Sequence, residues 1–336
     1  MIIAQTRYRC HCGSGIYLGY RFSPQPYYLL LTASLLRKNG EDVKLVDQFN
    51  DVASDNISDA YLLGTGEYAA DVQYKYELPS NYSEYQYTGV SAWFNRDILK
   101  SNIIEAEQLM DMKPAWDLID FTRYPKPDSR LRACLRLSFG CPNRCNFCPV
   151  PVIFKQKYHR LNFDFAVEQI EYLYKEREIR EFALYDDNIF ADVELGKKLL
   201  EWIIQHDIKA KFFIQEGFEV KQMVDAELCK LAYKAGIYNP RLGVETLSEE
   251  ALKLCNKPYH NHNMVFEAIK NMQDAGYKAQ DIVIFLIQGL DGNTEKAEQD
   301  DIKILGETKC TIRNHRLIKY KSNLVMHEPV KQSVLF

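Results

Sequence analysis

Hydrophobic and polar positions follow two patterns along the chain, and the change between them lies near residue 125. In the first part, Met1–Ala4 and Asp42–Asp47 have strand-like patterns, and the apolar run Pro26–Leu36 between them predicts a helix. The helix is followed by Lys38, Asn39 and Gly40, residue types that are common where helices stop. Further strands are predicted at Ala60–Gly66 and Tyr87–Ala92.

From Leu131 onward, strand and helix patterns alternate regularly, with Asn162 and Ser248 as expected helix caps and Gly236 as a helix stop. Parallel neighbours need crossover connections, and a right-handed series of these curls the sheet and gathers the loops after the strands at one edge. The sequence therefore predicts an α/β fold, a partial (β/α)6 barrel over residues 126–336 preceded by a small, reduced doubly wound α/β domain over residues 1–125. The expected barrel strands are Ala133–Phe139, Phe182–Tyr185, Ala210–Gln215, Pro240–Val244, Asp281–Ile287 and Arg313–Tyr320.

Composition restricts the class of protein. The chain has 336 residues, 46% of them hydrophobic and 26% charged, which suffices for one large or two ordinary folded domains. A net charge of -4 gives no global basic field, so nucleic acid is not favoured as a partner. The start lacks a secretory signal and no apolar run reaches the ~20 residues of a membrane span, so we expect a cytoplasmic protein without a membrane segment. Nine cysteines, an odd number, fit a reduced compartment with metal ligands better than a disulfide framework.

Cys141, Cys145 and Cys148 form a CxxxCxxC loop directly after the first barrel strand. This spacing is expected to bring the three sulfurs to one point, as clustered thiolate ligands require. Structural zinc is the weaker alternative, because neither a second CxxC pair nor an HxxxH follows Cys148. Thiolates suit iron and sulfide, and three ligands for a four-iron cube leave one iron open. The loop therefore predicts a 4Fe–4S cluster.

With Phe147 just before its last cysteine, the loop resembles the signature of the radical S-adenosylmethionine (SAM) enzymes. The resemblance implies that Cys141, Cys145 and Cys148 bind iron, that SAM chelates the open iron, and that Phe147 packs beside the adenine. Reductive cleavage of SAM would then give a 5'-deoxyadenosyl radical that abstracts hydrogen from a substrate. The reducing electron would come from a donor such as flavodoxin or ferredoxin. The substrate is not identified by the sequence, and small molecules, peptides and nucleotides all stay open.

Residues just after the strands are expected to share the barrel mouth with the cysteine loop. By resemblance, Asp186 or Asp187 would hold the ammonium group of SAM, with a solvated acidic turn as the alternative. Glu245 would bind the ribose hydroxyls or a substrate amine, with a charge at a helix N-terminus as the alternative. The turn at Gly289 would let the backbone approach the adenine, since glycine has no Cβ. No catalytic residue is assigned, and the other residues expected at the mouth are Tyr185, Gln215 and Gln288.

The amino-terminal part resembles a shortened cobalamin-binding domain, which precedes the barrel in one radical SAM subfamily, and Lys113–Pro125 resembles the connecting segment. The usual Asp-x-His-x-x-Gly motif is absent, so cobalamin binding stays open. With cobalamin, the expected reaction is C-methylation. Without it, a radical rearrangement or oxidation is expected, and a structural metal-binding module without catalysis is a further alternative. Cys10 and Cys12 are more simply explained as incidental than as a second metal site.

Overall fold

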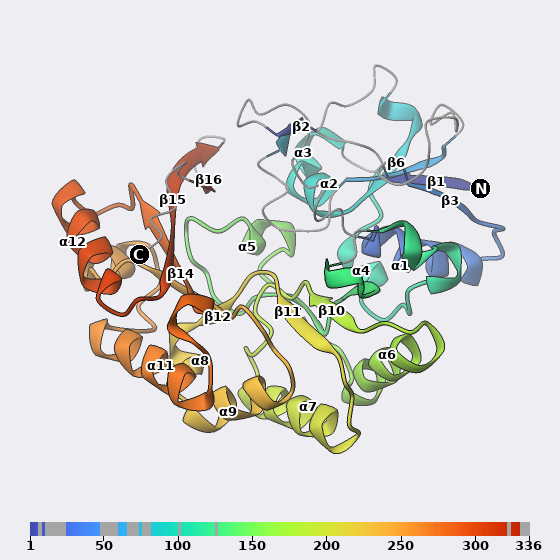
Figure 1. The fold of residues 1–336 in the computed structure, drawn as a ribbon. Helices are drawn as coiled ribbons and strands as arrows, with labels where there is room; N and C mark the ends of the chain where they lie inside the picture. The colour runs from blue at the N-terminus through green and yellow to red at the C-terminus, as the bar shows by residue number, and fades with distance from the viewer. Residues whose placement is uncertain are drawn as a thin grey trace.

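The computed structural model describes residues 1–5, 9–10, 25–47, 60–65, 74–75, 82–99, 102–124, 127–320 and 324–329. Two α/β units follow one another along the chain, an amino-terminal sheet and a larger curved sheet surrounded by helices (Figure 1). The expected boundary between residues 125 and 126 lies outside the described residues and stays a prediction. The side chains of Cys10 and Cys12 lie outside them as well.

The amino-terminal sheet is parallel and doubly wound, which confirms this part of the fold prediction. From β1 (Ile2–Gln5), the chain passes through α1 (Tyr27–Lys38) to the next strand of this sheet, which lies on one side of β1. The later strands of the sheet lie on the other side of β1. In spatial order the strands are β3 (Lys44–Asp47), β1 (Ile2–Gln5), β4 (Leu62–Gly64) and β6 (Gln86–Thr88). A separate antiparallel pair consists of β2 (Arg9–Cys10) and β5 (Tyr74–Lys75).

The strand expected over Tyr87–Ala92 is wrong beyond Thr88. Gly89 has φ +100°, and α2 (Val90–Phe94) begins directly after it. Glycine allows this change of direction because positive φ is costly for residues with a Cβ. A short apolar run does not distinguish a strand from a buried helix, which explains the error. The remaining helices of this unit are α3 (Arg96–Leu99) and α4 (Ala106–Leu109), followed by the 3-10 turns η5 (Trp116–Leu118) and η6 (Phe121–Arg123).

The six predicted barrel strands are present in the expected order, and those that neighbour one another within a sheet run parallel. The first of them ends at Leu135 and not at Phe139, because Ser138–Gly140 pairs separately with an antiparallel strand. Among the described residues, an isolated bridge between Phe212 and Ile237 connects the third barrel strand to the chain just before the fourth. No pairing in this part of the chain joins the first strand to the last. In the described part of the chain, the strands form a partial barrel made of a three-stranded and a five-stranded sheet. Its strands are β7 (Arg132–Leu135), β10 (Glu181–Leu184), β11 (Lys211–Ile214), β13 (Arg241–Glu245), β14 (Val283–Gln288) and β15 (Thr311–Tyr320), extended by β12 (Phe218–Glu219) beside β13 and by the antiparallel β16 (Leu324–Pro329).

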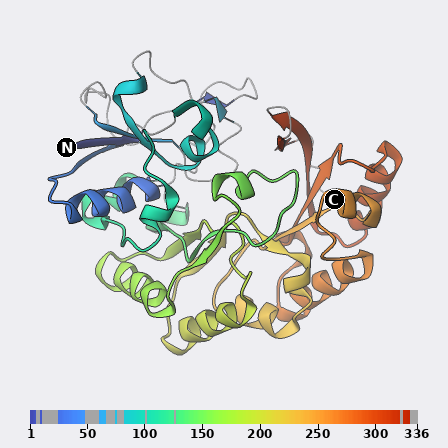
Figure 2. The ribbon, with the colours of Figure 1, turned by 180° about the vertical axis from the view of Figure 1, so that it is seen from behind.

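Helices cover the outside of the barrel strands, as the view from behind also shows (Figure 2). The expected caps are confirmed, since the side chain of Asn162 accepts from the Asp164 N–H and that of Ser248 from the Ala251 N–H. Within the described ranges, no helix is long and apolar enough to cross a membrane. The helices are α6 (Phe163–Glu176), α7 (Val193–Gln205), α8 (Val220–Met223), α9 (Ala226–Lys234), α10 (Glu249–Leu254), α11 (His262–Ala275) and α12 (Glu295–Gly306).

The outer edge of β7 is covered by a side chain of the amino-terminal unit. Gln25 is 2% exposed, and its Nε2 donates to the Arg132 carbonyl while its Oε1 accepts from the Cys134 N–H, each at 2.8 Å. One amide thus makes the pair of bonds that a neighbouring strand would make, and it satisfies backbone groups that are exposed at a sheet edge. The two units are thus joined at the outer edge of β7.

Replacing Gln25 with Leu should destabilise the protein, because it leaves a buried carbonyl and a buried N–H without partners. Each unsatisfied group costs about 1–3 kcal/mol, so the free energy of unfolding should fall by about 2–6 kcal/mol in urea denaturation followed by circular dichroism. Gln205→Leu, at an exposed position of α7, is the control and should change stability by less than about 0.5 kcal/mol. Equal stability of the Gln25→Leu variant and the wild type would contradict the bridging role.

Candidate metal centre

The cysteine loop lies between β8 (Ser138–Gly140), which pairs with β9 (Tyr158–Arg160), and α5 (Val150–Ile153). Gly140 opens the loop with φ +75°, and a Cβ at this position would lie 2.2 Å from the carbonyl oxygen of Lys157. Both the backbone conformation and the close approach therefore require glycine.

Arg144 holds the loop from within. Its Nη1 donates to the carbonyls of Cys141 and Asn143, both at 3.1 Å, and to that of Pro142 at 3.2 Å. Its Nη2 donates to the carbonyl of Gln156, beyond α5. A single guanidinium thus satisfies backbone groups on both sides of the loop and keeps the loop compact.

None of the three thiols of the loop is in a disulfide, and Cys145 is buried while Cys141 and Cys148 are half-buried. Burial raises the pKa of Cys145 to about 12. Burial is the main reason that the pKa of Cys148 lies well above its usual range, and the nearby thiol of Cys145 raises it further. Among the residues that the structure describes, however, no three His, Cys, Asp or Glu side chains are grouped closely enough to hold a metal ion. The three thiols are nonetheless close enough that Cys145 and Cys141 both raise the pKa of Cys148, and their convergence on one cluster stays a prediction.

The donor set of the loop still fits an iron–sulfur cluster. It offers three soft thiol ligands, and a bound metal offsets the cost of thiolates in a buried setting. Phe147 and Cys145 belong to an apolar cluster that covers one side of the loop and limits the access of water. The other members of that cluster are Ala251, Cys255, Ile287 and Leu290, with Cys148, Tyr259 and Leu317 at its margin.

Asp187 lies under the loop in an ion pair that the sequence did not predict. Its Oδ2 is 2.9 Å from Nη1 of Arg136, which is 1% exposed, and accepts from the Gly140 N–H at 3.1 Å. The guanidinium also lies 5.2 Å from the ring centre of Tyr28 in the amino-terminal unit. In the described part of the chain, the other carboxylate oxygen, Oδ1, is buried without a hydrogen-bond partner. One face of Asp187 thus supports the loop, and its second oxygen is available to a ligand.

Asp186 has a different role, since it fixes the strand beneath the loop. Its carboxylate accepts from the Leu137 N–H at 3.0 Å and from the Ser138 hydroxyl at 2.6 Å, and it is fully buried. Burial raises the pKa of Asp186 to about 6. The alternative of a solvated acidic turn is therefore wrong for Asp186 and Asp187, and of the two, Asp187 contacts the loop.

Glu245 forms a second buried ion pair beside the cysteines. It has φ +64° at an irregularity of β13, and its Oε1 is 2.6 Å from Nζ of Lys257, which also donates to the Gly243 carbonyl at 3.0 Å. Burial lowers the pKa of Lys257, but the surrounding negative groups, chiefly the Glu245 carboxylate, together hold that pKa above its usual value. Both charges act on Cys145, in opposite directions. The alternative of a helix N-terminal charge is wrong, because α10 begins only at Glu249.

The remaining predicted residues lie at strand ends as expected. Gly289 has φ +82°, and its N–H donates to Oε1 of Glu298 at 2.6 Å. Ile287 and Leu290, on either side of this turn, pack in the same cluster as Phe147, so the turn lies beside the cysteine loop. The roles of Tyr185, Gln215 and Gln288 stay predictions.

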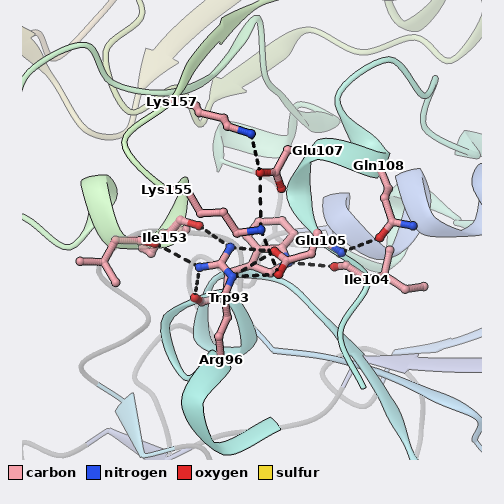
Figure 3. A network of polar contacts seen from close by, with 10 residues as sticks. Trp93, Arg96, Ile104, Glu105, Glu107, Gln108, Ile153, Lys155 and Lys157 are labelled. Carbon is pink, nitrogen blue, oxygen red and sulfur yellow. Dashed lines mark hydrogen bonds and ion pairs between the residues drawn. The ribbon is translucent and has the colours of Figure 1, made fainter. Parts of the chain in front are cut away.

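A polar network fastens the amino-terminal unit to α5, which directly follows the cysteine loop (Figure 3). Arg96 donates to the carbonyl of Ile153 at 2.8 Å and pairs with Glu105 at 2.8 Å. Lys155 lies 3.2 Å from Glu105 and 3.5 Å from Glu107. Carboxylates of the amino-terminal unit thus pair with cations from both units at this contact.

Sequence reasoning missed Arg136, Lys257, Asn188 and Glu219. Arg136 and Lys257 each pair with a carboxylate outside their own element. Asn188, which follows β10, contacts the loop at Cys141, and Glu219 of β12 contacts it at Asn143. A charged residue in the otherwise apolar run Ala133–Phe139 was the one signal that could have identified Arg136, since an isolated buried charge is costly.

The raised pKa of Asp186 predicts a specific pH dependence of stability. The unfolded carboxyl releases its proton near 3.8 and the folded one at about 6, so the folded state binds the proton more tightly and stability falls as pH rises through this window. Relative to Asp186→Asn, which keeps an acceptor oxygen, the wild type should lose about 2 kcal/mol of unfolding free energy between pH 4 and pH 7. Urea denaturation at several pH values measures this difference. Parallel curves for the two proteins would contradict it.

Comparisons with known proteins agree with this architecture. The family model of the radical SAM superfamily matches residues 135–304. An uncharacterized methyltransferase of Synechocystis is 22% identical over 240 residues, covering 69% of this chain and 43% of the relative. The hopanoid C-2 methylase of Rhodopseudomonas palustris is 23% identical over 216 residues, covering 60% and 40%. The chain thus spans less than half the length of these curated relatives.

Among solved structures, that of TsrM from Kitasatospora setae has a similar fold. It is a radical SAM methyltransferase with cobalamin and a [4Fe–4S] cluster bound, and it superposes with a TM-score of 0.70 over 95% of this chain and 75% of that one. The sequence identity is 12%, so the likeness concerns the fold. It includes both the amino-terminal sheet and the barrel, because nearly the whole chain is covered.

Proposed function

Because this chain belongs to the radical SAM superfamily, we propose that it is an enzyme that binds a 4Fe–4S cluster through Cys141, Cys145 and Cys148 and cleaves SAM reductively. The observation that carries the proposal is the compact three-thiol loop, fixed by Arg144 and Gly140 at the carboxyl ends of the parallel barrel strands. Active sites of related barrels lie at this face.

The residues around the loop have separate tasks in the proposed enzyme. When held by the three cysteines of the loop, the cluster would supply the electron for cleavage of a C–S bond of SAM, which would release methionine and provide the radical that abstracts hydrogen from the substrate. The second oxygen of Asp187 would accept a hydrogen bond from the SAM ammonium, while Arg136 holds that carboxylate in place. The apolar cluster around Phe147 excludes water from the reactive site. An external one-electron donor such as flavodoxin or ferredoxin would reduce the protein.

Methyl transfer is the net reaction that we propose, with cobalamin bound by the amino-terminal sheet. The methyltransferase and methylase relatives support the reaction type, and the doubly wound strand order, shared in fold with the cobalamin-containing TsrM structure, supports the cofactor. In such sheets, ligands bind outside the carboxyl ends of the strands. The acceptor carbon is unidentified.

Anaerobically purified protein should be brown and should form 5'-deoxyadenosine from SAM in the presence of dithionite. Cys145→Ala should abolish both, because the cluster loses one of its three ligands. Cys310→Ala, at a buried cysteine outside the loop, is the control and should keep the colour and the cleavage. A colourless wild type holding zinc would refute the proposal, as would full cleavage by the Cys145→Ala variant.

Cobalamin binding is tested separately by adding hydroxocobalamin to the anaerobic protein, removing the excess by gel filtration, and recording the absorption spectrum. We expect about one cobalamin per chain and the same stoichiometry in Cys145→Ala, because the proposed site lies on the other unit. A wild type that retains the cluster but no cobalamin would refute methylation through cobalamin while leaving SAM cleavage intact.

A further inference from the structure

Asn188 follows Asp187 at the carboxyl end of β10 and is 4% exposed. Its Nδ2 lies 3.5 Å from the sulfur of Cys141, within hydrogen-bond range for a sulfur acceptor. We propose that Asn188 is a positioning residue that donates a hydrogen bond to the Cys141 sulfur and thereby raises the reduction potential of the cluster. This inference rests on the proposed function, since it concerns the cluster that the loop would hold.

The direction of this hydrogen bond is fixed by a chain of donors that begins at the backbone. The Glu219 N–H can only donate, and it donates to Oε1 of Gln222 at 3.0 Å. The other end of the Gln222 amide is then Nε2, which donates to Oδ1 of Asn188 at 2.6 Å. The atom of Asn188 that faces the sulfur is therefore the donor Nδ2, and the assignment follows from the network.

Glu219 also holds Asn188 from the other side. Its Oε1 accepts from Nδ2 of Asn188 at 2.5 Å and from Nδ2 of Asn143, which belongs to the cysteine loop. If the Asn188 amide were turned over, its carbonyl oxygen would face the Glu219 carboxylate, and the two acceptors would repel each other. Both N–H groups of Asn188 thus have partners, one at the carboxylate and one at the sulfur.

A hydrogen bond to a cluster ligand affects the two redox states unequally. Reduction adds one electron from an external reductant and breaks no bond, so negative charge on the cluster and its sulfur ligands increases. A fixed N–H donor stabilises the more negative state more strongly, and hydrogen bonds to the sulfurs are among the factors that set cluster potentials. The effect is larger in a buried site because water screens the interaction less. Asn188 should therefore make the cluster easier to reduce.

The test is a potentiometric titration of the anaerobic, cluster-loaded protein, followed by EPR of the reduced state. Asn188→Leu removes the donor with little change in volume, and the midpoint potential should become more negative by about 59 mV, which corresponds to tenfold in the equilibrium constant of a one-electron reduction. The matched control is Asn146→Leu in the same loop, where Nδ2 donates instead to the Leu254 carbonyl at 3.0 Å. Its potential should equal that of the wild type.

A second variant covers the case in which Asn188→Leu fails to retain iron. Gln222→Leu leaves the Asn188 donor in place but removes the group that orients it, so a smaller negative shift is expected. If Asn188→Leu holds the cluster and its midpoint potential equals that of the wild type, the inference is overturned. If Asn188→Leu holds no cluster, a wild-type midpoint potential in Gln222→Leu overturns it instead. A wild type without iron–sulfur absorption would refute the proposed function itself, and the inference with it.

Discussion

Arg136 carries a positive charge into the interior of the protein, and the position of the cysteine loop depends on how that charge is neutralised. Asp187 pairs with it and, through the same oxygen, accepts the N–H of Gly140 at the start of the loop. An uncompensated buried charge costs several kcal/mol, so the pair and the loop are constrained together. Tyr28 lies against the guanidinium, which brings the amino-terminal unit into the same constraint.

The two units of the chain are therefore difficult to treat as independent. One continuous core cluster includes Tyr28 and Trp93 of the first unit and Phe139 and Phe154 of the second. Hydrogen bonds and ion pairs also join the two units, and they constrain the contact more specifically than apolar packing does because they require particular atoms to meet. They attach to the edge of β7 and to the helix after the cysteine loop, on either side of the site.

Features that arise from local sequence were predictable, whereas long-range pairings were not. Strand patterns and the helix caps at Asn162 and Ser248 depend on neighbouring residues, and they located the barrel strands and two of the outer helices correctly. The pairing of Arg136 with Asp187 spans 51 positions and depends on the parallel register of β7 and β10, which no local pattern encodes. The side-chain directions of the three cysteines depend on χ angles, and spacing alone does not determine them.

The contacts of Arg144 have a consequence for how a cofactor could be inserted. Three successive carbonyls of the loop are already bound to one guanidinium, so the backbone is ordered by the chain itself. Ordering a residue costs about 1–2 kcal/mol in backbone entropy, and here that cost is met during folding. Cluster assembly then has to order only the thiol side chains, so more of the iron–sulfur bond energy is left for retaining the cluster.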